Sequence, residues 1–324
     1  MPKVSVIIPV YGVEKYIERC ARSLFEQTLD DIEFIFVNDC TPDNSINVLE
    51  TTLEEYPKRK SQVRIINFEQ NQGAAKAREI GMKTAKGEYI IHCDSDDWVV
   101  KEAYETLYNI ATASESDMVI CDWFETDGKQ QKHITQAIPS SQKEILQGLV
   151  KRGISASLGN RLVRRNVIQS NNIIYPTAHM MEDVALSIQL TYFCKKITYV
   201  STPLYFYFSN ENSICKKIGT ETSLKRYNQA CSNVNIVIEF LKHQSVLKEF
   251  SNEVVILKNY PRTFIWKLLL ENPTKYYKLW INTYPEINRQ YIHTKGVPFS
   301  LKLIFLLTLL RIYPYIHKIL KALK

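Results

Sequence analysis

The first 120 residues alternate between two hydrophobic periodicities, and this alternation constrains the fold more than any other feature of the chain. Short apolar runs rich in β-branched residues are separated by segments whose apolar residues recur at helical spacing. The strand-like runs are 4–10, 32–37, 63–68, 88–93 and 118–121, and the helical segments are 14–28, 45–56, 72–85 and one from about 101. This pattern predicts the α/β class, with a mostly parallel, Rossmann-like sheet that helices cover on both faces.

The regular alternation ends at about residue 140, and helical spacing prevails beyond about 224. The polar segment CKKIGTETS, which starts at Cys215, marks a boundary between these two parts. We therefore predict an α/β domain over residues 1–215 and a helical C-terminal region over residues 216–324, which includes a basic amphipathic tail.

A polar cluster follows each of the first four predicted strands. The clusters are YGVEK at 11–15, NDCTPD at 38–43, NQG at 71–73 and DSDD at 94–97. In parallel sheets, ligands bind beyond the carboxyl ends of the strands. We therefore expect the four loops to converge on one ligand-binding crevice.

The last of these clusters places Asp94, Asp96 and Asp97 at the end of an apolar strand. Carboxylates so close together repel one another and raise one another's pKa unless a positive charge neutralises them. Carboxylate oxygens suit Mg²⁺ or Mn²⁺, and a D-x-D segment can hold such an ion against a diphosphate. Capping of the next helix is the alternative, and the residues by themselves favour neither.

The other clusters contain further candidate residues, each with an ordinary structural alternative. Asp39 can accept the imide proton of a uracil ring, or form an Asx-turn. Lys76 and Arg78 can neutralise phosphate or bind a base, or lie on a solvated helix face. Glu182 and Asp183 precede a helical pattern, where the helix dipole favours acids and also keeps a general base ionised.

In chain order, these segments resemble glycosyltransferase family 2, the inverting nucleotide-sugar transferases of the GT-A fold. The resemblance is strongest in the first third of the chain and weaker in SLGNRLVRR, MEDVAL and PLYFYFSNENSI. The strongest segments are VSVIIPVYGVEKYIERCARSLFEQT, IEFIFVNDCTPDNS and NQGAAKAREIGMKTAKGEYIIHCDSDDWV. The resemblance implies that residues 1–215 form a GT-A catalytic domain that takes a UDP-sugar donor.

The resemblance also implies roles for the donor-side residues. Pro9, Tyr11 and Glu14 would line the nucleotide pocket, and Asp39 would contact the uracil with Arg78 nearby. The acceptor would be a hydroxyl of a glycan or of a lipid-linked molecule in surface polysaccharide synthesis.

For the chemical step, the resemblance implies a metal pair and a base. Asp96 would bind Mn²⁺ or Mg²⁺ directly, with Asp94 in a supporting position near the ribose or the metal's waters. Asp183 would be the catalytic base, with Glu182 supporting it or the acceptor. The resemblance gives Asp97 no such role, so for Asp97 we keep the structural interpretation, a cap for the helix that follows.

The sequence departs from the family pattern at four positions. Gly12 replaces the usual Asn, Cys40 replaces Gly, Glu79 replaces the Asn after the arginine, and Gly159 stands where a Trp is common. The first two remain compatible with nucleotide binding, whereas the last two leave the sugar and the acceptor open.

The C-terminal end is basic and apolar. The formal net charge is +7, and no acid follows Glu286. The cations of 298–324 are interleaved with Leu, Ile and Phe without a nucleic-acid motif, so we expect contact with an anionic membrane surface and no nucleic-acid partner. The apolar run 303–310 is far below the ~20 residues of a spanning helix. Packing of this tail onto the protein is an equal alternative.

Seven scattered cysteines without a C-x-x-C pair indicate reduced thiols, and we expect a cytoplasmic protein. If the tail binds a membrane, the protein would be peripheral at the inner face of the cell membrane. Two other classes of protein stay open. One is a non-catalytic nucleotide-sugar-binding module, in which the acids at 182–183 would be dispensable. The other is a nucleotidyltransferase, which would carry a Gly-rich basic loop after its first strand, where this chain has PVYGVEKYIE.

Overall fold

The computed structural model describes residues 1–209 and 219–322, and the side chains of 321 and 322 are not described. The described residues fall into two compact units. The first unit consists of Met1–Leu149 and the described residues from Ile154 to 209. The second consists of 150–153 and the described residues from 219 on. The predicted boundary at 215/216, and the last letters of PLYFYFSNENSI, lie outside the described residues.

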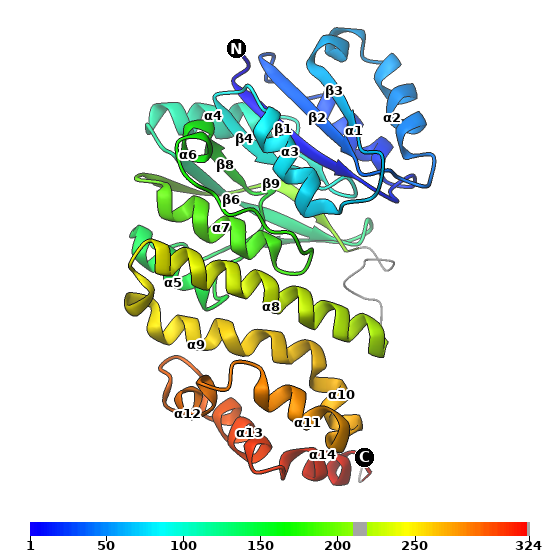
Figure 1. Cartoon of the computed structure of the whole chain (residues 1–324). Helices are drawn as coiled ribbons and strands as arrows, with labels where there is room; N and C mark the ends of the chain where they lie inside the picture. Colours follow the sequence, from blue (N-terminus) through cyan, green and yellow to red (C-terminus); the bar gives the residue numbers. More distant parts are fainter. Residues whose placement is uncertain (210–218, 323–324) are drawn as a thin grey trace. The chain divides into compact units, whose positions relative to one another are not determined.

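A single curled sheet forms the centre of the first unit (Figure 1). Its strands in spatial order are β3 (Val63–Asn67), β2 (Ile32–Asn38), β1 (Val4–Val10), β4 (Tyr89–His92), β8 (Arg161–Arg164), β6 (Met118–Thr126), β9 (Ile197–Phe208) and β5 (Trp98–Val99), and β7 (Gln131–Ile134) pairs with β6. The four strands from β3 to β4 are parallel. The strands beyond them pair antiparallel, except that β6 and β9 are parallel.

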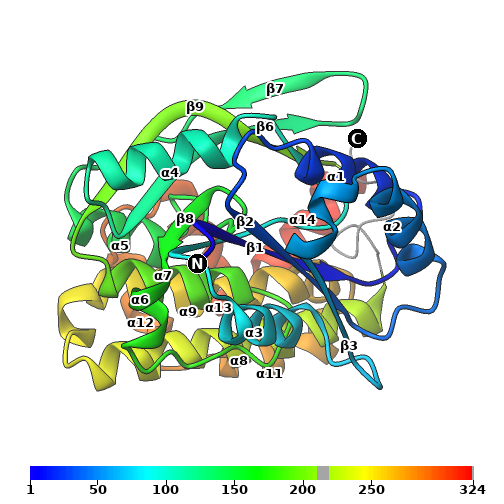
Figure 2. The same ribbon diagram turned by 90° about the horizontal axis from the view of Figure 1, so that it is seen from above.

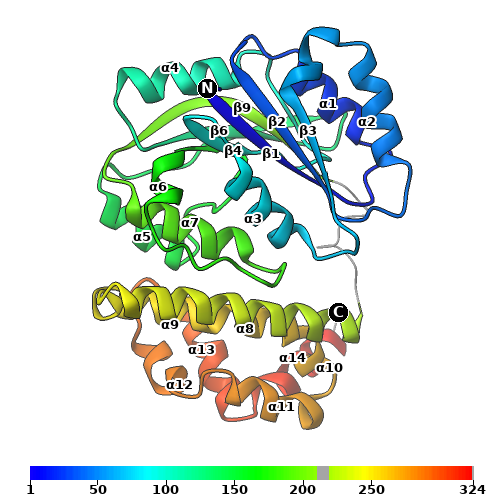
Figure 3. The same ribbon diagram turned by 45° about the horizontal axis from the view of Figure 1, so that its top comes forward.

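Helices cover both faces of this sheet, as the alternation predicts. Alternate residues of β1 point to opposite faces, so that Val6 and Ile8 join one hydrophobic cluster and Ile7 joins the other. The first cluster includes residues of α1 (Ile17–Phe25), α2 (Ser45–Glu54) and α4 (Ala103–Ala113). The second includes residues of α3 (Ala74–Thr84), α6 (Arg165–Gln169) and α7 (Glu182–Phe193). Figure 3 shows α3 on the opposite side of the parallel strands from α1 and α2. The α/β prediction is therefore confirmed.

Two shorter elements complete this unit, the 3-10 helix η1 (Pro57–Gln62) and helix α5 (Gln142–Val150). The hairpin of β6 and β7 extends beyond the neighbouring strands (Figure 2).

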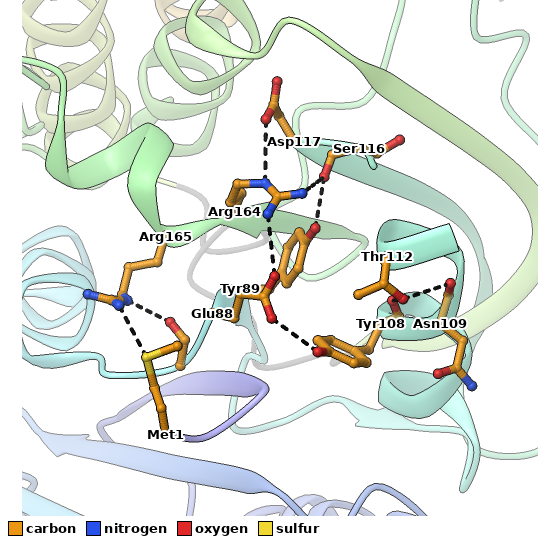
Figure 4. A network of polar contacts seen from close by, with 11 residues as sticks. Met1, Glu88, Tyr89, Tyr108, Asn109, Thr112, Ser116, Asp117, Arg164 and Arg165 are labelled. Atoms are coloured by element: carbon orange, nitrogen blue, oxygen red, sulfur yellow. Dashed lines mark hydrogen bonds and ion pairs between the residues drawn. The ribbon is translucent and has the colours of Figure 1, made fainter. Parts of the chain in front are cut away.

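A polar network joins β8 to β4 at the amino end of β4. The guanidinium of Arg164 lies 3.3 Å from Glu88 Oε1 and 3.5 Å from Asp117 Oδ1, and it donates to the carbonyl of Ser116 at 3.2 Å (Figure 4). The Tyr108 hydroxyl donates to the same Glu88 carboxylate at 3.0 Å. Arg164 therefore fastens the antiparallel strand at the end of β4 that is remote from the acidic turn.

The second unit is helical, as predicted for the C-terminal region. Its core includes Trp280, Ile265 and Leu269, which are at most 1% exposed. The segment 224–270, predicted as two helices, is divided further, and a 3-10 turn carries Pro261 near its start, where a missing amide hydrogen costs no bond. The elements are α8 (Thr220–His243), η3 (Leu247–Phe250), α9 (Ser251–Asn259), η4 (Tyr260–Ile265), α10 (Trp266–Glu271), α11 (Pro273–Asn282), α12 (Ile287–Gln290), η5 (Tyr291–His293), α13 (Phe299–Leu309) and α14 (Tyr313–Ala322).

Within the described part of the chain, no single helix has the length and apolar composition needed to cross a membrane. Helices α13 and α14 meet that requirement only as a pair, and the pair is bent by 111°.

Candidate functional site

The loops after β1 and β2 are joined by hydrogen bonds at the carboxyl edge of the parallel strands. The backbone amide of Gly12 donates to Thr41 Oγ1 at 2.9 Å, and that of Glu14 donates to Asp43 Oδ2 at 2.9 Å. In the other direction, Glu14 Oε2 accepts the amide of Asn44 at 3.2 Å. The two loops thus form one ledge, although their residues are about 30 positions apart in the chain.

The predicted pocket residues of the first loop lie on or beside this ledge. Pro9 is half-buried near the end of β1, opposite Val37 of β2. Tyr11 is 47% exposed and is therefore available to a ligand. Glu14 is exposed, although its carboxylate already accepts a backbone amide.

Asp39 is only 2% exposed, and its carboxylate anchors the loop after β3. Oδ1 accepts the amide of Gln72 at 2.6 Å, and Oδ2 accepts the amide of Gly73 at 2.7 Å and the side-chain amide of Asn71 at 3.0 Å. An ionised carboxylate can accept about four hydrogen bonds, so these three leave room for one more donor. The predicted contact with a base is therefore compatible with a second function of Asp39, which holds two loops together.

Cys40 occupies the position where the family usually has glycine, and its φ is +54°. The left-handed region costs a non-glycine residue roughly 1–2 kcal/mol. The positive φ thus explains why the family usually has glycine at this position. In this chain, the backbone of Cys40 is strained at the turn after β2.

Arg78 of α3 joins two acidic segments that are distant in sequence. Its Nη2 lies 2.5 Å from Asp94 Oδ1, and its Nη1 lies 2.9 Å from Glu182 Oε1. Burial lowers the pKa of Arg78, but the charges of these two carboxylates outweigh that effect and raise it. The resemblance implies a place for Arg78 near Asp39 and the uracil, whereas its hydrogen bonds go to the D-x-D and E-D segments. Lys76, expected to face phosphate or a base, is paired with Glu79 at 2.9 Å on the same helix.

Helix α7 begins with the two acids of the E-D segment, after Met181 in a left-handed conformation with φ of +70°. Burial, opposed by the charge of Arg78 and reinforced by repulsion from Asp183, raises the pKa of Glu182 to about 7. The Asp183 carboxylate accepts a hydrogen bond from the backbone amide of its neighbour Val184 at 2.8 Å. Glu182 is thus committed to Arg78, whereas Asp183 is half-buried and carries no ion pair in the described part of the chain.

Asp96 is the D-x-D carboxylate that makes no ion pair within the described ranges. Burial, and then the charge of Asp94, raise the pKa of Asp96 to about 6. Its backbone carbonyl accepts a hydrogen bond from Arg19 Nη2 at 2.9 Å, which holds the turn but leaves the carboxylate available.

The donor set fits a divalent ion that keeps non-protein ligands. Within residues 1–209 and 219–322, no group of three or more His, Cys, Asp or Glu side chains could enclose a metal ion. Mg²⁺ and Mn²⁺ sites commonly combine one or two carboxylates with waters and phosphate oxygens. Asp96 and the half-exposed Asp94 suit that arrangement, because the repulsion between them also favours a cation.

Asp97 does not cap a helix, contrary to the expectation from sequence. It is 1% exposed, and its Oδ1 accepts the amide of Phe208 at 2.7 Å while its Oδ2 accepts the hydroxyl of Tyr205 at 2.5 Å. The Tyr205 hydroxyl also accepts the amide of Asp94 at 3.2 Å. Burial, and then the charges of the two neighbouring aspartates, raise the pKa of Asp97. The third aspartate therefore fastens the acidic turn to β9.

The family model described as Glycosyl transferase family 2 matches residues 5–170, which include every strand-end cluster above. This chain belongs to glycosyltransferase family 2. EpsH of Bacillus subtilis (strain 168), named as a glycosyltransferase, is 32% identical over 261 residues, which are 78% of this chain and 73% of EpsH.

Solved structures show that the fold is GT-A. S. aureus TarS 1-349 in complex with UDP-GlcNAc matches with a TM-score of 0.71 at 19% identity, over 99% of this chain and 92% of that one. The mannosyltransferase PcManGT from Pyrobaculum calidifontis, in complex with GDP-Man and Mn²⁺, matches with a TM-score of 0.53 at 14% identity, over 97% of this chain and 82% of that one. The prediction of a glycosyltransferase of this fold is confirmed.

The fold also explains the family departure at Gly159. A Cβ atom there would lie 2.6 Å from Cε2 and Cζ of the Tyr205 ring, which no real pair of atoms tolerates. The ring that supports the acidic turn thus takes the space beside this position. Tyr205 belongs to the segment PLYFYFSNENSI, and nothing in the sequence indicates its contact with Asp97.

Two further residues of the site carried no separate signal in the sequence. Arg161 is 1% exposed and donates to the carbonyls of Ser155 and Ser157, both at 2.5 Å. Burial lowers its pKa to about 10, partly offset by the charge of Asp183. His179 lies against Gly73, where a Cβ atom would meet its ring carbon Cε1 at 1.9 Å. The loop before α7 therefore covers the loop after β3.

Proposed function

We propose that this glycosyltransferase moves a sugar from a UDP-sugar to a hydroxyl of a glycan or lipid-linked acceptor, with inversion, in surface polysaccharide synthesis. One observation carries the proposal, the bridge that Arg78 makes between Asp94 and Glu182. The bridge joins residues 16 and 104 positions away along the chain, and it brings the D-x-D and E-D segments into one site.

The donor site is assigned to the ledge and the acidic turn. Pro9, Tyr11 and Glu14 line the nucleotide pocket, and Asp39 accepts the imide proton of the base with its remaining acceptor position. Lys76 is assigned to the diphosphate as well. Its ion pair with Glu79 lies on a helix surface, where such pairs contribute little stability, so Lys76 can leave Glu79 and bind a phosphate.

Asp96, with support from Asp94, would hold Mn²⁺ or Mg²⁺. Such an ion supplies positive charge that stabilises the diphosphate leaving group. Arg78 adds a fixed positive charge beside the same turn, and its two carboxylates hold it in position.

Asp183 is the proposed base. It accepts the proton of the acceptor hydroxyl, the hydroxyl oxygen bonds to the anomeric carbon, and the bond from that carbon to the diphosphate breaks. A single displacement from the opposite face inverts the configuration without a covalent glycosyl-enzyme. Glu182 acts as a positioning residue through Arg78, since its carboxylate is occupied by the guanidinium.

We also place this chemistry in the cytoplasm. The support is the scatter of the seven cysteines along the chain, which form no C-x-x-C pair.

The test incubates the full chain with a panel of UDP-sugars and Mn²⁺ or Mg²⁺ and measures UDP release. Asp183→Asn keeps the shape but removes the base, and we expect transfer to fall by roughly 10²–10⁴-fold with UDP affinity unchanged. Asp30→Asn, at an exposed acid before β2, is the matched control and keeps full activity.

Near wild-type transfer by Asp183→Asn would refute the base assignment. Donor binding without transfer to any acceptor would instead support a binding module, and pyrophosphate release from a nucleoside triphosphate would support a nucleotidyltransferase.

A further inference from the structure

Helix α13 has an exposed apolar stripe on one side. Phe299, Leu303 and Leu306 of α13 and the C-cap residue Leu310 follow the spacing i, i+4, i+7 and i+11, which is that of one side of a helix. Their side chains are 79%, 43%, 39% and 59% exposed. A surface helix of a monomer normally presents polar residues on this side.

The opposite side of α13 already fixes the helix to its own unit. Phe305 is 4% exposed, and its ring centroid lies 5.2 Å from that of Trp280 and 4.4 Å from that of Tyr291. Thr308 is fully buried and donates to the carbonyl of Ile304 at 2.7 Å. The helical unit therefore does not need the exposed stripe for its core.

The following helix also exposes large apolar side chains. Tyr315, Ile319 and Leu320 of α14 are 54%, 62% and 55% exposed. Nine of the twelve exposed large hydrophobic side chains in the described part of the chain lie within 299–320. Exposed apolar side chains scattered singly over a surface are ordinary, whereas their concentration in this one segment points to an interaction surface.

The charges beside this surface identify the partner. No acid follows Glu286, and Lys302, Arg311 and Lys318 lie within the two helices or at their junction. A second copy that docked through the same surface would place these cations against like charges, and a nucleic acid would leave the apolar stripe without a partner. An anionic lipid surface satisfies both features, since it accepts apolar side chains and attracts cations.

We infer that α13 and α14 lie on the surface of an anionic membrane, with the stripe of α13 at the boundary of headgroups and acyl chains. Each helix is about 15–17 Å long, about half of the ~30 Å hydrocarbon core, so the pair lies in the interface and does not span. This surface is formed by the helical unit alone, so the inference does not depend on the donor or the base proposed above.

The test measures sedimentation of the full chain with vesicles of neutral phosphatidylcholine, and with vesicles in which a third of the lipid is phosphatidylglycerol. We expect binding to the anionic vesicles that weakens as salt is added. The variant Leu306→Ser with Leu310→Ser should bind roughly tenfold or more weakly for each leucine removed. Leu301→Ser is the matched control, because Leu301 is 48% exposed on the same helix but faces about half a turn away from the stripe.

A charge arm separates electrostatic attraction from apolar insertion. Lys318→Gln should weaken binding to anionic vesicles about fivefold, whereas Lys278→Gln, at an exposed lysine of α11, should leave it unchanged. Thermal denaturation shows that each variant is folded, and the salt dependence of the unaltered chain gives a readout that needs no variant.

The inference would be overturned if the variant with Leu306→Ser and Leu310→Ser sedimented as much as the unaltered chain. It would also be overturned if binding of the unaltered chain depended on neither salt concentration nor lipid charge. A chain that binds neither vesicle and forms a dimer that the same leucine substitutions dissociate would assign the surface to a second copy.

Discussion

Removal of one oxygen atom, in Tyr205→Phe, tests how the acidic turn is held. The Tyr205 hydroxyl donates to Asp97 Oδ2 at 2.5 Å and accepts the amide of Asp94 at 3.2 Å. Asp97 is 1% exposed, so no water replaces the lost donor without local opening. The ring of the phenylalanine still fills the space beside Gly159.

The magnitude follows from the kind of hydrogen bond that is lost. A bond to a buried ionisable group contributes about 1.5–3 kcal/mol, and the unsatisfied carboxylate retains its desolvation cost. For a unit of about 200 residues, this loss corresponds to a decrease in Tm of about 3–12 °C. The amide of Asp94 also loses its acceptor, so we expect weaker binding of UDP with Mn²⁺ as the turn loosens.

The assay combines thermal denaturation with calorimetric titration of UDP and Mn²⁺. Tyr199→Phe is the matched control, since the Tyr199 hydroxyl donates at 2.7 Å to Asp122, which is fully buried and belongs to β6. The control should lose a similar amount of stability and keep its UDP affinity. An unchanged Tm in Tyr205→Phe, or an equal loss of UDP affinity in both variants, would refute the reasoning.

Three further predictions concern the same unit. Arg78→Lys keeps the charge but cannot bridge two carboxylates, so we expect a loss of about 2 kcal/mol or more in thermal denaturation and a drop in UDP release; full stability would contradict this. Gly73→Ala combines a φ of +92° with a clash against His179, so it should weaken UDP affinity and lower the free energy of unfolding by about 1–3 kcal/mol. Gly128→Ala is the control, because its φ is +90° but its Cβ would have its nearest contact at 3.5 Å, and it should lower the free energy of unfolding by less. The pKa of Asp96 is raised to about 6, so its ionised fraction falls as the pH falls below that value. We therefore expect Mn²⁺ affinity to decrease about tenfold per pH unit below about 6. An affinity that is flat from pH 5 to 7 would refute the assignment of Asp96 as a metal ligand.

The parallel half of the sheet and the edge that carries the site were predictable from local patterns. Alternating periodicities identify the strands and helices, and parallel strands bring their carboxyl ends to one edge. For this reason the sequence alone predicts that Asp39, Asp94 and the loop at 71–73 lie at one crevice. The structure adds that Asp39 holds that loop by three hydrogen bonds.

The partner of each polar group was not predictable, because pairing depends on distance in space and not along the chain. Arg78 lies on a helix whose local sequence fits a solvated face, yet it is 8% exposed and bridges acids 16 and 104 positions away. Asp97 follows a strand, as a helix cap often does, yet β9 supplies both of its donors.

The order and spacing of residues were enough to indicate the family, the α/β class, and the short list of acids available for metal and base chemistry. These follow from the order and spacing of residues, which local periodicity and motif order record directly. Only the tertiary structure decided which acid is occupied and which is available, since Glu182 is bound by Arg78, Asp97 by Tyr205, and Asp96 and Asp183 make no ion pair in the described part of the chain. The ionisation of a carboxylate is set by burial and by neighbouring charges, and those neighbours come together only in the folded chain.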